Sequence, residues 1–118
     1  MFNMILKRAL IVSMPVFGAN ADAGISKELL ANHCYELSET VTSLVASQQK
    51  STCIDKLYTA SMQMNTAAEL ILDDSSSVAR PIMDNAVSAL QFAELNGCNR
   101  YIQISHSKLE ANKLKRLL

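Results

Sequence analysis

The sequence predicts an all-α fold: a small four-helix up-down bundle with one disulfide, following a cleaved N-terminal signal peptide. Apolar residues recur at alternating steps of three and four in successive segments, as they do on a helix that packs beside another helix. No strand-like alternation or Asn-Gly hairpin signal interrupts these segments. Cys53 and Cys98 bracket two of the expected helices, where a covalent bond would hold the pair together.

The first helix is expected from Ser26 to about Gln48, and the second from about Cys53 to Leu72. Thr52, with Asp55 three residues later, has the pattern of a capping box at the start of the second helix. The apolar stripes of the two helices are Leu30, Cys34, Leu37, Val41 and Leu44, and then Leu57, Ala60, Met64, Ala67 and Ile71.

The run from Asp73 to Ser77 has no apolar residue and predicts the clearest loop of the chain. A third helix follows, with Ser77 or Arg80 as its cap and Pro81 in its first turn, where the missing backbone N–H costs little. Its apolar rows are Ile82, Ala86, Ala89 and Ala93, beside Met83, Val87 and Leu90. Gly97 is expected to end this helix in a left-handed conformation.

The fourth helix, expected from about Arg100 to Leu117, has the least regular pattern. Ile102, His106 and Leu109 share one apolar face, but the leucines nearer the C-terminus stand among basic residues. The apolar stripe is therefore broken, and this helix is expected to dock least firmly.

Residues 1–23 have the features of a secretory signal peptide. Lys7 and Arg8 precede an apolar stretch of nine residues, and a small-x-small pattern that a signal peptidase recognises ends at Ala23. Cleavage is expected after Ala23, with Ala21 as the second choice. The alternative is an amphipathic first helix of a cytosolic protein. The apolar stretch is too short for a permanent anchor, which needs roughly 20 residues.

The remaining residues, 24–118, are expected to form a single helical domain in the periplasm or outside the cell. This part carries nine basic and ten acidic residues and only four aromatic ones. A protein that binds nucleic acid needs a local excess of Lys and Arg, so nucleic acid is not expected as a partner.

The cysteines can be assigned from the geometry of an up-down bundle. Cys53 and Cys98 lie at the same pole, whereas Cys34 lies about 16 residues, or roughly 24 Å, along the first helix from that pole. A disulfide requires a Cα separation under about 7 Å. The sequence therefore predicts a Cys53–Cys98 bond, with Cys34 buried or unpaired. If the row of Cys34 is exposed, an intermolecular disulfide through it would give a homodimer.

No catalytic constellation is present, and neither an enzyme nor a cofactor is expected. His33 and His106 are too few and too badly spaced for a metal site, and a solvated turn explains Asp73 and Asp74. His106 is expected in the core or at its rim. Gap filling in the core, rather than soft-metal binding, is expected for three methionines, Met62, Met64 and Met83.

The C-terminal residues are basic and apolar, and they could rest on an anionic membrane surface. They are Lys113, Lys115, Arg116, Leu117 and Leu118. Cations at a helix C-terminus also complement the helix macrodipole, which explains them without a membrane.

A cleaved leader, Cys34 early in a long helix, Cys53 about twenty residues later and Cys98 just past the next helical pair resemble the outline of the Tai-type periplasmic immunity proteins. The resemblance covers roughly residues 30–98. It implies a small, helical, disulfide-bonded protein that binds a cognate toxin delivered by type VI secretion. Small exported proteins of conjugation systems, including ones that harm the recipient host, have a similar outline.

The function expected from the sequence is that of a non-enzymatic exported protein that binds another protein. It would act as an immunity factor or as an accessory of a secretion or conjugation system. The alternative is an envelope-acting toxin or plasmid-encoded host-killing protein. Such a protein would need the same export and could use the basic C-terminal helix on the membrane.

Overall fold

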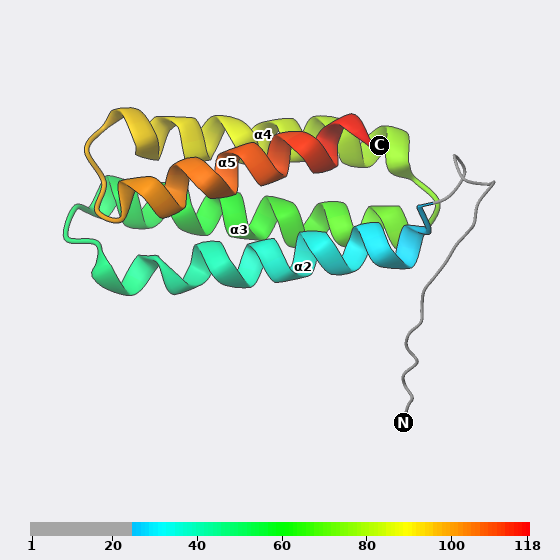
Figure 1. The fold of residues 1–118 in the computed structure, drawn as a ribbon, viewed down its shortest axis with the longest axis horizontal. Coiled ribbons are helices and arrows are strands. Elements are labelled where there is room, and N and C mark those ends of the chain that lie inside the picture. Colours follow the sequence, from blue (N-terminus) through cyan, green and yellow to red (C-terminus); the bar gives the residue numbers. More distant parts are fainter. Residues whose placement is uncertain (1–24) are drawn as a thin grey trace, which may run out of the picture.

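The computed structural model describes residues 25–118, which form a four-helix bundle with no strand (Figure 1). Its elements are α2 (Lys27–Ser43), the 3-10 turn η2 (Val45–Ser47), α3 (Ser51–Leu72), α4 (Ser76–Leu95) and α5 (Tyr101–Arg116). Helix α3 packs between α2 and α4, and α5 packs on α4 and, less extensively, on α2. The predicted signal peptide, with Ala21 and Ala23, lies outside the described residues.

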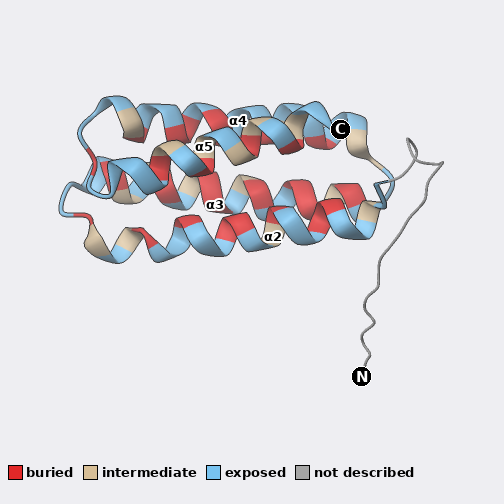
Figure 2. Cartoon of the chain, in the orientation of Figure 1, coloured by how far each residue is buried: buried red, intermediate tan, exposed pale blue. Residues whose placement is uncertain are grey.

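The core is built from the apolar stripes that the sequence indicates on the first three helices (Figure 2). Every stripe residue named above for α2 and α3 is buried. Burial of a leucine-sized side chain contributes about 1.5–3 kcal/mol, so these stripes supply most of the force that docks the helices. Met64 and Met83 are fully buried, as predicted. Met62 is 61% exposed, so its predicted core position is wrong; it stands two residues from Met64 and faces away from the core.

The predicted capping box at the start of α3 is wrong. The helix begins at Ser51, and the N-cap is Lys50, which makes no side-chain capping hydrogen bond. The carbonyl of Lys50 accepts hydrogen bonds from the backbone N–H groups of Cys53 and Ile54, at 3.1 Å each. Thr52 therefore lies inside the first turn, too far along to cap it.

Helix α4 starts earlier than predicted, at Ser76, with Ser75 as its N-cap. Pro81 is therefore the sixth residue of the helix and not part of its first turn. Its missing N–H leaves the carbonyl of Ser77 without a helical partner. Both residues are exposed, so water can take that hydrogen bond.

Helices α3 and α4 end in the same way, with a left-handed residue just past the helix. Gly97 has φ 71°, as predicted, and Asp74 has φ 61°. The N–H of Ser75 donates to the carbonyl of Leu70 at 2.8 Å. The N–H of Cys98 likewise donates to the carbonyl of Ala93 at 3.3 Å. This pattern is the Schellman motif, which pairs carbonyls that a helix end leaves free.

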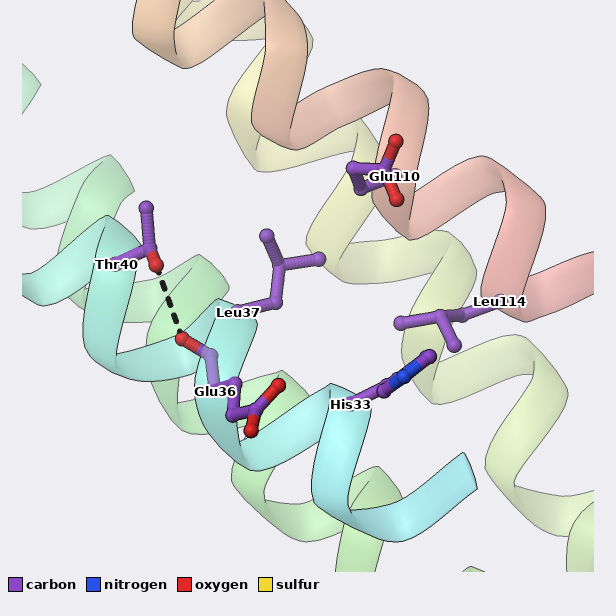
Figure 3. A pocket seen from close by; sticks show the side chains of 6 residues that line it. All are labelled: His33, Glu36, Leu37, Thr40, Glu110 and Leu114. Atoms are coloured by element: carbon purple, nitrogen blue, oxygen red, sulfur yellow. Dashed lines mark hydrogen bonds between the residues drawn. The ribbon is translucent and has the colours of Figure 1, made fainter. Parts of the chain in front are cut away.

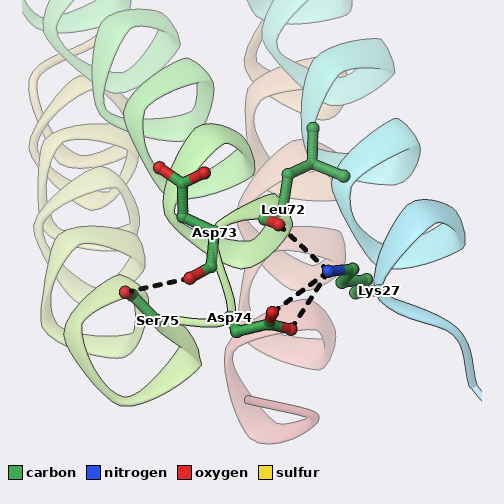
Figure 4. A network of polar contacts seen from close by, with 5 residues as sticks. All are labelled: Lys27, Leu72, Asp73, Asp74 and Ser75. Atoms are coloured by element: carbon green, nitrogen blue, oxygen red, sulfur yellow. Dashed lines mark hydrogen bonds and ion pairs between the residues drawn. The ribbon is translucent and has the colours of Figure 1, made fainter.

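A lysine side chain ties the first turn of α2 to the end of α3 (Figure 4). The Nζ atom of Lys27 donates to the carbonyl of Leu72 at 3.2 Å and lies 3.1 Å from the carboxylate of Asp74. Asp73 and Asp74 thus belong to a helix end, and one of them is paired with a cation. The ion pair is well exposed, so it contributes less than about 1 kcal/mol.

Candidate functional site

The predicted disulfide is present between Cys53 and Cys98, with a Cα–Cα distance of 5.7 Å. Cys53 lies in the first turn of α3, and Cys98 follows the end of α4. The bond therefore closes the open end of the α3–α4 hairpin. This confirms both the pairing and the order of the helices from which it was inferred.

Beside the disulfide, the side chain of Gln48 joins the two loops at this pole. Its Oε1 accepts a hydrogen bond from the backbone N–H of Asn99 at 2.8 Å, and its Nε2 donates to the Asn99 carbonyl at 2.7 Å. Nε2 also donates to the carbonyl of Leu44 at 3.0 Å. Gln48 is buried, and its hydrogen bond to Leu44 is shielded from water, whereas its two hydrogen bonds to Asn99 are only partly buried. The sequence had indicated only a polar run here.

Cys34 is free and fully buried on the core face of α2. This agrees with the prediction of a buried cysteine and not with the alternative, in which its row is exposed and forms an intermolecular disulfide. Burial raises the pKa of its thiol to about 11. The nucleophilic thiolate is therefore scarce at neutral pH. An intermolecular disulfide through this residue would require the bundle to open first.

The residues considered as metal ligands are dispersed. Within residues 25–118 no group of three or more His, Cys, Asp and Glu side chains is placed to hold a metal ion. His33 is exposed on α2. His106 is exposed on α5, so its predicted place in the core or at its rim is wrong. Over the same residues, no helix is both long and apolar enough to cross a membrane.

A groove of about 240 Å³ runs along the seam between α2 and α5 (Figure 3). Leu37 of α2 and Leu114 of α5 are buried at its base and provide an apolar floor. Polar side chains form the walls: His33, Glu36, Thr40 and Glu110. The groove exists because α2 and α5 pack less extensively than the other neighbouring helices.

The walls of this groove carry one carboxylate with no cation paired to it in the described part of the chain. Glu36 is exposed, and its backbone carbonyl accepts a hydrogen bond from the hydroxyl of Thr40 at 3.1 Å. Glu110 forms an ion pair with Lys113 at 3.2 Å. The groove can therefore take an apolar side chain on its floor and a cationic group beside Glu36.

A second groove, of about 450 Å³, lies between α2 and α3, and Asn65 lines it from the α3 side. Hydroxyl groups that line or adjoin it bond to one another. The Ser61 hydroxyl lies 2.7 Å from the hydroxyl of Ser38 and 2.6 Å from that of Thr42. These hydroxyls are already satisfied, so we interpret them as joining α2 to α3 rather than awaiting a ligand.

Helix α5 differs from the sequence-based expectation in the face that it buries. Its core side consists of Ile104, Ser107, Ala111 and Leu114. The predicted apolar face, with Ile102 and Leu109, points to solvent; these side chains are 76% and 55% exposed. The helix thus buries a serine hydroxyl, that of Ser107, which has no hydrogen-bond partner in the described part of the chain, while it exposes larger apolar side chains.

Ion pairs fix the side of α5 that meets α4. Lys108 lies 2.6 Å from Glu94, which also accepts a hydrogen bond from the Ser105 hydroxyl at 2.6 Å. The hydrogen bond from Lys108, followed by that from Ser105, lowers the pKa of the Glu94 carboxyl. Lys115 pairs with Asp84 at 3.0 Å.

The C-terminal residues proposed for membrane contact therefore divide into two groups. Lys115 is paired with α4, and Leu118 packs partly on the core. Lys113, Arg116 and Leu117 are exposed.

No protein family, curated protein or solved structure was found to match the chain.

Proposed function

We propose that this chain is an exported, non-enzymatic protein that binds another protein through the α2–α5 groove. Its role would be that of an immunity factor or of an accessory to a secretion or conjugation system. The observation that carries the proposal is the groove itself, which combines an apolar floor with a carboxylate that has no cation paired to it within residues 25–118. Small-molecule and peptide sites commonly pair apolar walls with a few such polar groups.

The groove defines the chemistry of its occupant. Leu37 and Leu114 would lose their remaining contact with water against an apolar side chain, and Glu36 would pair with a Lys or Arg of the partner. On a helix, side chains three or four residues apart project on the same face. The expected partner is therefore an amphipathic helix with a Leu-like anchor and a cation one turn away.

Export is supported by two independent features. One is the signal-peptide pattern over residues 1–23. The other is the disulfide, because such bonds persist in oxidising compartments and are rare in the cytosol.

The alternative, an envelope-acting toxin, is favoured by the exposed apolar residues on α5. Growth and membrane integrity separate the two functions. Bacteria would express the chain with its leader or residues 24–118 alone. Binding to a partner protein predicts healthy growth with both forms, whereas death or leakage only with the leader would assign the chain to the envelope-acting alternative.

The binding role is tested by capture with matched charge reversals. Glu36→Lys changes the groove wall, and Glu69→Lys makes the same change at an exposed position on α3, away from the groove. A partner crosslinked in cells to the exported protein should be lost with Glu36→Lys and retained with Glu69→Lys. Equal capture by both variants would exclude the α2–α5 groove as the binding site.

A further inference from the structure

The charge of the bundle is strongly segregated. Residues 100–118, which contain α5, carry five basic residues and one acidic residue. Residues 25–99 carry four basic and nine acidic residues. The near-neutral net charge of the whole chain hides this division. Lys108 and Lys115 pair with carboxylates of α4, so the excess positive charge of α5 lies mainly with its other basic residues.

The same helix carries a stripe of two apolar and two cationic residues that no other helix within residues 25–118 covers. Ile102, Leu109, Lys113 and Arg116 recur at steps of seven, four and three, which places them on one face, opposite the buried side. Lys113 forms only an exposed ion pair within its own helix, and Arg116 has no ion pair among the described residues. We call these four residues the outer face of α5.

From these observations we propose that the outer face of α5 docks on an anionic lipid surface. Interfacial helices combine shallow apolar side chains with Lys and Arg, and the cations contribute attraction to acidic headgroups. The stripe lies on the outside of the bundle, and Ile102 and Leu109 line neither of the two grooves described above. A protruding stripe fits a flat, deformable surface without requiring a complementary cleft.

Charge also distinguishes this occupant from a second copy of the chain. A symmetric contact between two outer faces would bring Lys113 and Arg116 of each copy toward another cationic helix. Like charges brought together oppose association, whereas acidic headgroups attract the same cations.

The test is co-sedimentation of disulfide-bonded residues 24–118 with lipid vesicles. All four described helices lie within residues 25–118, and omitting residues 1–23 keeps the apolar stretch of the predicted signal peptide out of the measurement. Vesicles of phosphatidylcholine mixed equally with phosphatidylglycerol should bind the protein, and pure phosphatidylcholine should not. Binding should weaken as added salt shortens the Debye length from about 8 Å to about 3 Å.

Variants separate the apolar and cationic parts of the outer face. Ile102→Ser with Leu109→Ser should abolish binding, while Met62→Ser, an equally exposed apolar change on the diagonally opposite α3, should leave it unchanged. Arg116→Gln should lower the partition coefficient about fivefold, the equivalent of about 1 kcal/mol per cation. Arg80→Gln, an exposed cation on α4, is the matched control.

Three results would overturn the proposal. They are equal binding to both kinds of vesicle, no binding by a protein whose circular dichroism shows a folded bundle, and a concentration-dependent dimer that Ile102→Ser dissociates. The last would assign the outer face to a second copy of the chain.

Discussion

The hydrogen bonds of Gln48 provide a sharp test of what holds the loop pole together. Gln48→Ala removes two hydrogen bonds to the backbone of Asn99 and one to the carbonyl of Leu44. Each contributes about 0.5–1.5 kcal/mol net, and leaving a shielded group unpaired adds to the loss. Because Asn99 is exposed and water can replace part of what is lost, we expect the free energy of unfolding to fall by about 2–3 kcal/mol.

Urea denaturation followed by circular dichroism measures this change, with Gln49→Ala as the control. Gln49 is the exposed neighbour and should cost less than about 0.5 kcal/mol. Equal stability of the two alanine variants would refute the assignment of Gln48 as the link between the loops.

Gln48→Glu separates the donor from the acceptor within the same side chain. A carboxylate can still accept from the N–H of Asn99, but it places a negative oxygen against two carbonyls. Protonation would restore a donor, so the pKa of the introduced carboxyl should be raised in the folded state. The variant should therefore regain stability relative to the native chain as pH falls. A further loss of stability relative to the native chain on acidification would contradict this geometry.

Three further predictions concern the disulfide, the free thiol and one ion pair. Replacing Cys53 and Cys98 together with alanine should lower the free energy of unfolding in urea by about 4 kcal/mol, the chain-entropy value for a sequence separation of 45 residues; a loss under about 1 kcal/mol would contradict it. Cys34, whose pKa burial raises to about 11, should resist a thiol reagent at neutral pH until urea unfolds the protein, and rapid labelling of the native protein would show that the core opens. The hydrogen bond from Lys108 lowers the pKa of Glu94, so this pair stabilises the fold above the ordinary carboxyl pKa and its contribution is lost as pH falls through the lowered pKa. Glu94→Gln should remove this loss of stability at low pH, which amounts to less than about 1 kcal/mol. An unchanged pH profile of stability would show that the pair contributes nothing.

The sequence was sufficient to predict the bundle, the disulfide and the buried row of Cys34. Those features depend on helical periodicity and on which helix ends share a pole, and both can be worked out from residue spacing alone. The left-handed residue at Gly97 was also predictable, because glycine readily adopts that conformation. Asp74 adopts it too, but because this residue is not glycine, its residue type did not predict the conformation.

The orientation of α5 could not be obtained in the same way. Its sequence contains two candidate stripes, and the one with the larger apolar residues, Ile102 and Leu109, is exposed. The opposite face was selected by contacts with other helices, including the pairing of Lys108 with Glu94. Periodicity identifies a stripe but does not show which stripe finds a partner.

The candidate site could not be predicted from the sequence for a similar reason. The groove joins Leu37 and Glu36 of α2 to Leu114 and Glu110 of α5, residues that are far apart in the chain and carry no motif. The role of Gln48 was equally hidden, because its partner is the backbone of Asn99 and any residue there would present the same atoms.

The most direct test of the proposed binding role is photo-crosslinking in cells that export the protein. A photoreactive p-benzoylphenylalanine would replace Thr40, on the wall of the α2–α5 groove, or Thr66, at an exposed position on α3. Binding through the groove predicts a discrete adduct with one partner protein from position 40 and none from position 66. The same adducts from both positions, or an adduct from position 66 alone, would contradict the account.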